Sequence, residues 1–127
     1  MLMVDIDHFK KINDIHGHDV GDQALKHVTN IIKDQLREDD LFCRYGGEEF
    51  VIFIPESDKV TIDKIGERIR LAVENSCFKD GEKDIAMTVS LGVVPYDNSL
   101  KDTYLKVDAA LYEAKNTGRN RVVSTLH

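Results

Sequence analysis

Alternating stretches of apolar and polar residues along the chain predict a single α+β domain. Short uninterrupted apolar runs are typical of buried strands, whereas apolar residues spaced three and four apart indicate helices. We expect strands at 2–6, 41–45, 49–54, 85–94 and 121–124, and helices at 8–15, about 19–36, 58–75 and 101–116. The resulting β-α-α-β-β-α-β-α-β order predicts a central, mostly antiparallel sheet with helices packed on it, in the two-layer manner.

Each predicted helix carries an apolar stripe that we expect to face the core. From the first helix to the last, the stripes are Phe9, Ile12 and Ile15; Leu25, Val28, Ile32 and Leu36; Ile62, Ile65, Ile69, Ala72 and Val73; and Leu105, Ala109 and Tyr112. Gly17 and Gly118 are expected to end the first and last helices, and 79–84 reads as a polar turn.

Composition narrows the possible functions only modestly. The 127 residues fit one domain, 1–127, and the charges sum to 17 − 23 = −6, which argues against a broad nucleic-acid surface but permits one nucleotide bound with a divalent metal. No apolar run is long enough to span a membrane, and no signal peptide is visible. Cys43 and Cys77 lack metal-site spacing and read as reduced thiols. We therefore expect a cytoplasmic location without direct membrane contact.

The start of the chain predicts that more protein lies upstream. Residues 1–4 already have the apolar character of a buried strand, with no cap or turn before them. We therefore expect a fragment of a longer protein, which can itself be membrane-anchored. The alternative is a natural start with Met1 as the initiator.

The turn between the second and third predicted strands carries an unusual pair of acids. Gly46 and Gly47 favour a hairpin turn, but adjacent carboxylates at Glu48 and Glu49 repel one another and do nothing for a tight turn. Their presence is better explained by a bound cation or a proton transfer.

Asp5 and Asp7 lie where the first strand ends and a helix begins, a common position for ligand sites. If this strand lies beside the hairpin, Asp5, Glu48 and Glu49 can converge on one or two Mg²⁺ ions. Backbone amides just after Asp7 begin a helix and suit a phosphate. The alternative is that these are solvated acids at a strand end.

Two further pairs of polar residues have both a binding and a structural interpretation. Asn13 and Asp22 flank the Gly17 turn and together can match the N–H and C=O edge of guanine, but both are also ordinary capping residues. Lys115 and Arg119 are candidate phosphate contacts, although cations near a helix C-terminus are favoured by the helix dipole in any case.

Arg37 and Asp40 lie just before the hairpin. They are suited to a planar base and its phosphate, because arginine offers a rigid fork of donors. A surface ion pair of little energetic weight is the alternative.

Taken together, these residues resemble the GGDEF-domain diguanylate cyclases over almost the whole chain. Gly46-Gly47-Glu48-Glu49-Phe50 matches the signature in its Glu variant. The other matching blocks are residues 5–14 (DIDHFKKIND), 17–22 (GHDVGD), 88–93 (TVSLGV), and 108–115 (DAALYEAK) together with 118–120 (GRN). Five blocks in order make the resemblance specific, although the family's usual preceding Asp-x-Leu-Thr-Gly-Leu-x-Asn-Arg-Arg segment is not in this chain. The resemblance implies a fold similar to nucleotidyl cyclase and polymerase palm domains.

The resemblance also implies roles for the acids. Asp5 and Glu48 correspond to metal ligands, helped by the Ile6 carbonyl, for what we expect to be two Mg²⁺ or Mn²⁺ ions. Glu49 corresponds to the acid that assists the second metal or deprotonates the attacking 3′-OH. The implied guanine-binding residues are Asn13 and Asp22; the phosphate cradle is formed by the His8 and Phe9 amides with Lys10, Lys115 and Arg119; and the inhibitory product site comprises Arg37, Asp40 and Arg68.

The implied activity is condensation of two GTP into cyclic di-GMP and two pyrophosphates. Each protomer holds one GTP, so a homodimer is expected, with an upstream sensor domain in the parent and with the product as inhibitor. The alternative is a non-catalytic regulatory domain that binds GTP or cyclic di-GMP. Degenerate members usually lose signature acids, whereas this chain keeps all three.

Overall fold

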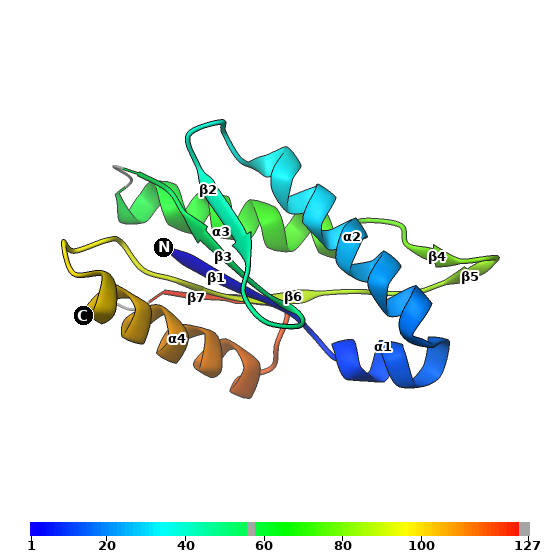
Figure 1. The fold of residues 1–127 in the computed structure, drawn as a ribbon. Helices are drawn as coiled ribbons and strands as arrows, with labels where there is room; N and C mark the ends of the chain where they lie inside the picture. Colours follow the sequence, from blue (N-terminus) through cyan, green and yellow to red (C-terminus); the bar gives the residue numbers. More distant parts are fainter. Residues whose placement is uncertain (56–57, 125–127) are drawn as a thin grey trace.

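A five-stranded sheet forms the centre of the computed structural model, which describes residues 1–55 and 58–124. The strand order is β2-β3-β1-β6-β7, and every neighbouring pair is antiparallel except β6 with β7 (Figure 1). The strands are β1 (Leu2–Ile6), β2 (Leu41–Arg44), β3 (Glu49–Phe53), β6 (Val89–Val93) and β7 (Val122–Ser124). The predicted element order and the mostly antiparallel sheet are therefore confirmed.

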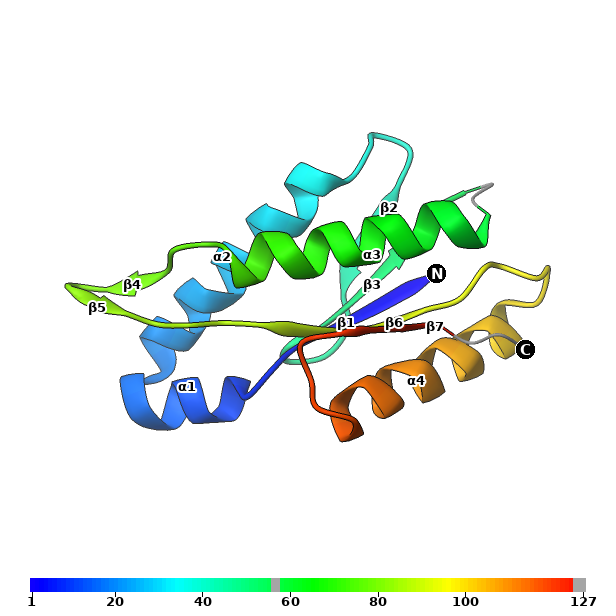
Figure 2. The same cartoon turned by 180° about the vertical axis from the view of Figure 1, so that it is seen from behind.

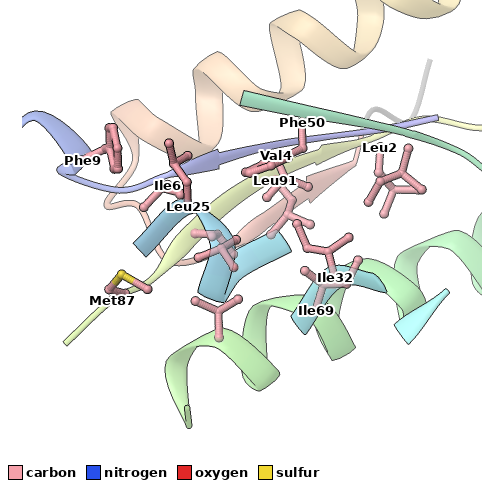
Figure 3. Close-up of a cluster of buried hydrophobic side chains, with 14 of the residues drawn as sticks. Leu2, Val4, Ile6, Phe9, Leu25, Ile32, Phe50, Ile69, Met87 and Leu91 are labelled. Atoms are coloured by element: carbon pink, nitrogen blue, oxygen red, sulfur yellow. The ribbon is translucent and has the colours of Figure 1, made fainter. Parts of the chain in front are cut away.

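Helices cover both faces of this sheet. The helices are α1 (Phe9–His16), α2 (His18–Gln35), α3 (Lys59–Glu74) and α4 (Leu100–Asn116). Helices α2 and α3 pack together on one face, with α1 at the end of α2, while α4 crosses the opposite face over β6 and β1 (Figure 2). The main core lies on the α2–α3 side and includes Leu2, Val4, Phe50 and Leu91 (Figure 3).

Three details differ from the sequence expectations. The polar stretch at 79–84 is a small two-stranded ribbon, β4 (Lys79–Asp80) and β5 (Lys83–Asp84), and the strand expected at 85–94 is regular only over β6. The second helix begins at His18, directly after Gly17, whose φ of 92° ends α1. Ile15 is 64% exposed, because the residues that the short α1 buries are Phe9 and Ile12.

The stripe predicted for α4 was also wrong. Leu105 and Tyr112 are 55% and 71% exposed, and the helix instead buries Thr103, Val107, Ala110, Leu111 and Ala114. Gly92 explains the choice of face: a Cβ there would lie 2.4 Å from the carbonyl oxygen of Val107. The backbone of the Val107–Leu111 turn therefore rests directly on β6 at Gly92, and this close approach decides which side of α4 faces the sheet.

Candidate active site

The acidic hairpin pairs directly with the strand that carries Asp5. In the antiparallel register of β1 and β3, Asp5 lies opposite Glu49, and the Ile6 N–H donates to the Glu48 carbonyl oxygen at 3.2 Å. The Asp5 carboxylate is buried, with 4% of the residue exposed, whereas Glu48 and Glu49 are half-buried. The structure thus brings these three predicted residues to one end of the β1–β3 pair.

Lys115 reaches this cluster from the last turn of α4. Its Nζ forms a close ion pair with Asp5 Oδ2 and lies 3.8 Å from Glu49 Oε1. Burial raises the pKa of Asp5 to about 6; Lys115 opposes that rise, and the charges of Glu48 and Glu49 add to it. Burial alone would lower the pKa of Lys115, but its carboxylate neighbours outweigh that effect and raise it. The sequence predicted a phosphate contact for Lys115 and gave no sign of this ion pair.

These oxygens have the chemistry of a hard-cation site but are not preassembled into one. Among the described residues, no three acidic, histidine or cysteine side chains are grouped as a ready-made metal site. Anionic carboxylates at Asp5 and Glu49 nevertheless already share a cation, the ammonium of Lys115. Carboxylate and carbonyl oxygens are the ligands that Mg²⁺ and Mn²⁺ prefer, so the residues fit a divalent metal.

Asp7 has a structural role at the same end of the sheet. Its carboxylate accepts hydrogen bonds from Thr88 Oγ1 at 2.7 Å, Ser90 Oγ at 2.6 Å and the Asn120 N–H at 2.9 Å. Asn120 and the preceding Arg119 both have left-handed backbone conformations. Asp7 therefore fastens the turn after α4 to the end of β1, and this places the exposed Arg119 near the site.

The start of α1 presents backbone donors beside this carboxylate. His8 is the N-cap residue in a left-handed conformation, with φ of 55°, and its side chain makes no capping hydrogen bond. Phe9 is the first helical residue, and Lys10 on the same turn is exposed. The first N–H groups of a helix lack intrahelical partners and attract anions.

Asn13 packs across the α1–α2 corner against Gly21, the residue before Asp22. A Cβ placed on Gly21 would lie 1.7 Å from Asn13 Oδ1, so the Asn13 amide rests on the backbone of α2 at the residue before Asp22. Asp22 itself is exposed in the second turn of α2. Glycine is required at position 21 for this approach, a reason the sequence alone did not supply.

Two residues outside the predicted set hold the hairpin turn. Arg44 Nε donates to the carbonyl oxygens of Gly46 and Gly47 at 3.2 and 3.1 Å. The Tyr45 hydroxyl lies 3.2 Å from that of Tyr104 on α4, with the rings edge to face. Helix α4 therefore contacts the hairpin through Tyr104 and through Lys115.

Arg37 and Asp40, in the loop between α2 and β2, lie beside Arg68 of α3. The Arg37 N–H donates to Asp40 Oδ2 at 2.7 Å, and Arg68 Nη2 donates to the Gln35 carbonyl oxygen at 2.7 Å. All three predicted residues line one hollow of about 180 Å³, and the first two also line a neighbouring hollow of about 440 Å³. A hydrogen bond from the Arg37 backbone to the Asp40 carboxylate thus closes this turn, and Arg68 of α3 is bonded to the end of α2 beside it.

The mixed sheet, with a carboxylate-bearing strand beside an acidic hairpin, has the α+β architecture of the nucleotidyl-cyclase type. The chain matches the family "Diguanylate cyclase, GGDEF domain" over residues 1–121. It therefore belongs to the GGDEF domain family, as the motifs indicated.

Relatives of known name agree with this assignment. The chain is 47% identical over 97% of its length to "Probable diguanylate cyclase DgcT" of Escherichia coli K12, covering 28% of that protein. It is 43% identical to "Diguanylate cyclase A" of Treponema denticola over 96% of the chain and 34% of that protein. The chain thus spans about a third or less of the length of these relatives.

Solved structures show the same fold. The GGDEF domain of DgcB from Caulobacter crescentus, in complex with c-di-GMP, matches with a TM-score of 0.93 and 36% identity, over 97% of this chain and 75% of that one. The active GGEEF domain of a diguanylate cyclase from Vibrio cholerae matches with a TM-score of 0.86 and 31% identity, over 99% and 81%. In residues 1–55 and 58–124, no helix is long and apolar enough to cross a membrane.

Proposed function

We propose that this chain is the catalytic domain of a diguanylate cyclase, which condenses two GTP into cyclic di-GMP and releases two pyrophosphates. The observation that carries the proposal is the direct pairing of Asp5 with Glu49 across β1 and β3, in a chain of the GGDEF family. A domain that only bound nucleotide would not need to keep both hairpin acids beside a buried carboxylate.

Diguanylate cyclases are metal-dependent as a family, and the oxygens of Asp5, Ile6, Glu48 and Glu49 are the proposed ligands for Mg²⁺ or Mn²⁺. When bound, the metal neutralises charge that develops on the phosphate oxygens. Glu49 is the more exposed acid of the Asp5–Glu49 pair and is the proposed acceptor of the proton from the attacking 3′-OH.

The remaining residues bind and orient one GTP. Asn13 and Asp22 read the guanine edge; the support is that the Asn13 amide packs against Gly21, directly before Asp22 in the chain. The amides of His8 and Phe9, with Lys10, receive phosphate oxygens at the start of α1. The cationic side of the cradle consists of Lys115 and Arg119, which α4 and the Asp7-bound turn hold at the same end of the sheet.

One such site holds half of the reaction. Each GTP contributes one 3′-OH and one α-phosphate, so two copies must meet face to face for both bonds to form. We therefore propose a catalytic homodimer, and an upstream regulatory domain that controls this meeting, as the length of the relatives suggests. A cytoplasmic location, where GTP is available, is part of the same proposal.

Cyclic di-GMP is proposed to inhibit through Arg37, Asp40 and Arg68. These residues line a common hollow and offer a donor fork with a second guanidinium. The GGDEF domain of DgcB, which shares this fold, was itself solved in complex with c-di-GMP.

In the decisive experiment, this chain is incubated with GTP and Mg²⁺ or Mn²⁺, and the cyclic di-GMP formed is measured. A longer protein that extends the chain at its N-terminus is assayed in the same way. We expect turnover, and we expect Glu49→Ala to lower it at least ~10²-fold, the usual cost of losing one group that stabilises the transition state. Binding of GTP without turnover in either protein would favour the regulatory alternative. Near-normal turnover in Glu49→Ala would reject the role of that residue.

A further inference from the structure

Lys115 lies between two acids, Asp5 and Glu49, that are proposed as metal ligands. Its Nζ is paired with Asp5 Oδ2 and lies 3.8 Å from Glu49 Oε1, which is across the strand pair from Asp5. The amine comes from α4, which packs over β1 on this face of the sheet. The ammonium is therefore held over the point where the two acid-bearing strands are in direct register.

This ammonium has a stabilising role when no metal is bound. Asp5 is almost fully buried, and a buried carboxylate without a counter-charge is strongly unfavourable. Within the described part of the chain, the ion pair with Lys115 is the one salt bridge that Asp5 makes. A bound divalent cation would satisfy Asp5 in the same way, but two cations cannot share the position.

We propose that Lys115 is a placeholder cation, which neutralises Asp5 in the metal-free protein and must leave when metal binds. The proposal rests on the proposed role of Asp5 as a metal ligand. Lysine suits such a displacement, since its charge sits on a flexible four-carbon stem. Phosphate oxygens of a nucleotide would give the released ammonium a new partner.

Cooperative binding of metal and nucleotide follows from this exchange. Metal alone must displace Lys115 into water, whereas metal with nucleotide gives both Asp5 and Lys115 a partner of opposite charge. Binding of either one therefore favours the other, as linkage requires. The placeholder also disfavours occupation of the site by metal in the absence of GTP.

Titration of the nucleotide-free protein with Mn²⁺, followed by the electron paramagnetic resonance signal of the free ion, tests this directly. We expect Lys115→Met to bind Mn²⁺ at least about tenfold more tightly than wild type, a change of about 1.4 kcal/mol. Lys101→Met is the matched control, because it removes one exposed lysine charge from the same helix. Lys115→Arg keeps a cation there and is expected to bind metal as weakly as wild type.

The outcomes separate this inference from the proposed function. If Asp5→Asn abolishes Mn²⁺ binding but Lys115→Met and Lys101→Met bind equally, the placeholder role is rejected while the metal site stands. If Asp5→Asn binds Mn²⁺ like wild type, both are rejected.

A second measurement needs no destabilising variant. In lysine-labelled wild-type protein, the Lys115 side-chain NMR signal, assigned by its loss in Lys115→Arg, should shift when saturating Mg²⁺ is added without nucleotide. A signal that does not respond to bound Mg²⁺ would overturn the placeholder role.

Discussion

Removing the Asp7 carboxylate is expected to destabilise the protein, because this carboxylate links the end of β1 to the β6 region and to the turn after α4. The three groups that donate to it come from the β6 strand region and from the turn after α4. Asp7→Ala leaves all three without this acceptor. The two hydroxyls can rotate toward other partners, but the backbone N–H of Asn120 cannot. Since hydrogen bonds to a charged group contribute ~1.5–3 kcal/mol each, we expect a loss of about 3–5 kcal/mol in the free energy of unfolding.

Asp7→Asn provides the comparison that isolates the carboxylate. The Asn oxygen can still accept from the Asn120 N–H, and its NH₂ can donate to the Ser90 hydroxyl, which is able to accept. The expected loss is only about 1–2 kcal/mol, since charge assistance disappears but the bonds remain. Urea denaturation measures both values, and Asp84→Ala, an exposed acid, should change stability by no more than about 0.5 kcal/mol.

The same variants probe the proposed phosphate cradle. Because Asn120 follows Arg119 directly, Asp7→Ala should raise the KM for GTP more than it lowers kcat, measured by pyrophosphate release. Equal destabilisation by Asp7→Ala and Asp7→Asn would refute the reasoning, because the backbone donor would then not depend on this acceptor.

Three further predictions concern other parts of the molecule. Gly92→Ala should lower the free energy of unfolding by about 2–3 kcal/mol through overpacking against α4, while Gly47→Ala, with open space around it, should have little effect on thermal unfolding. Arg37→Ala should weaken inhibition by cyclic di-GMP without lowering initial turnover; unchanged inhibition would reject that site. Burial lowers the pKa of His27 in the folded state below its value in the unfolded state. Neutral His27 therefore contributes its full share to the free energy of unfolding above the unfolded-state pKa, and that share is lost as pH falls through the folded-state pKa. Urea denaturation of His27→Gln at several pH values should lack this pH dependence.

The sequence predicted most elements of the fold because each is a local pattern. Apolar runs such as 2–6 and stripes such as Leu25, Val28 and Ile32 depend only on the spacing of neighbouring residues. The strand order did not follow from those patterns, since β1 pairs with residues about 45 to 90 positions away. The buried face of α4 was also beyond local reasoning, because Gly92 on another element decides it.

The residues of the site were likewise predictable where a local pattern marks them, and not where a tertiary contact decides their role. The acids were found because Glu48 and Glu49 lie where local structure has no use for them. The contacts of Asp7 with Ser90 and Asn120 were not found, since hydroxyls and backbone donors carry no signal in sequence. Lys115 was recognised as a cation, but which acid its flexible side chain would meet depended on how α4 crosses the sheet.

Along both β1 and α4, buried apolar residues give way to charged ones at the same end of the sheet. On the α4 side of the strand, Met3 is packed against that helix, and the next residue on this side is Asp5. Along α4, buried Leu111 is followed one turn later by Lys115. A carboxylate at the end of a buried strand is unfavourable without a counter-charge. Asp5 is tolerated here because α4 places the Lys115 ammonium directly beside it. The position of α4 on Gly92 therefore sets the charge balance of the site, so any substitution that shifts this helix should alter metal affinity as well as stability.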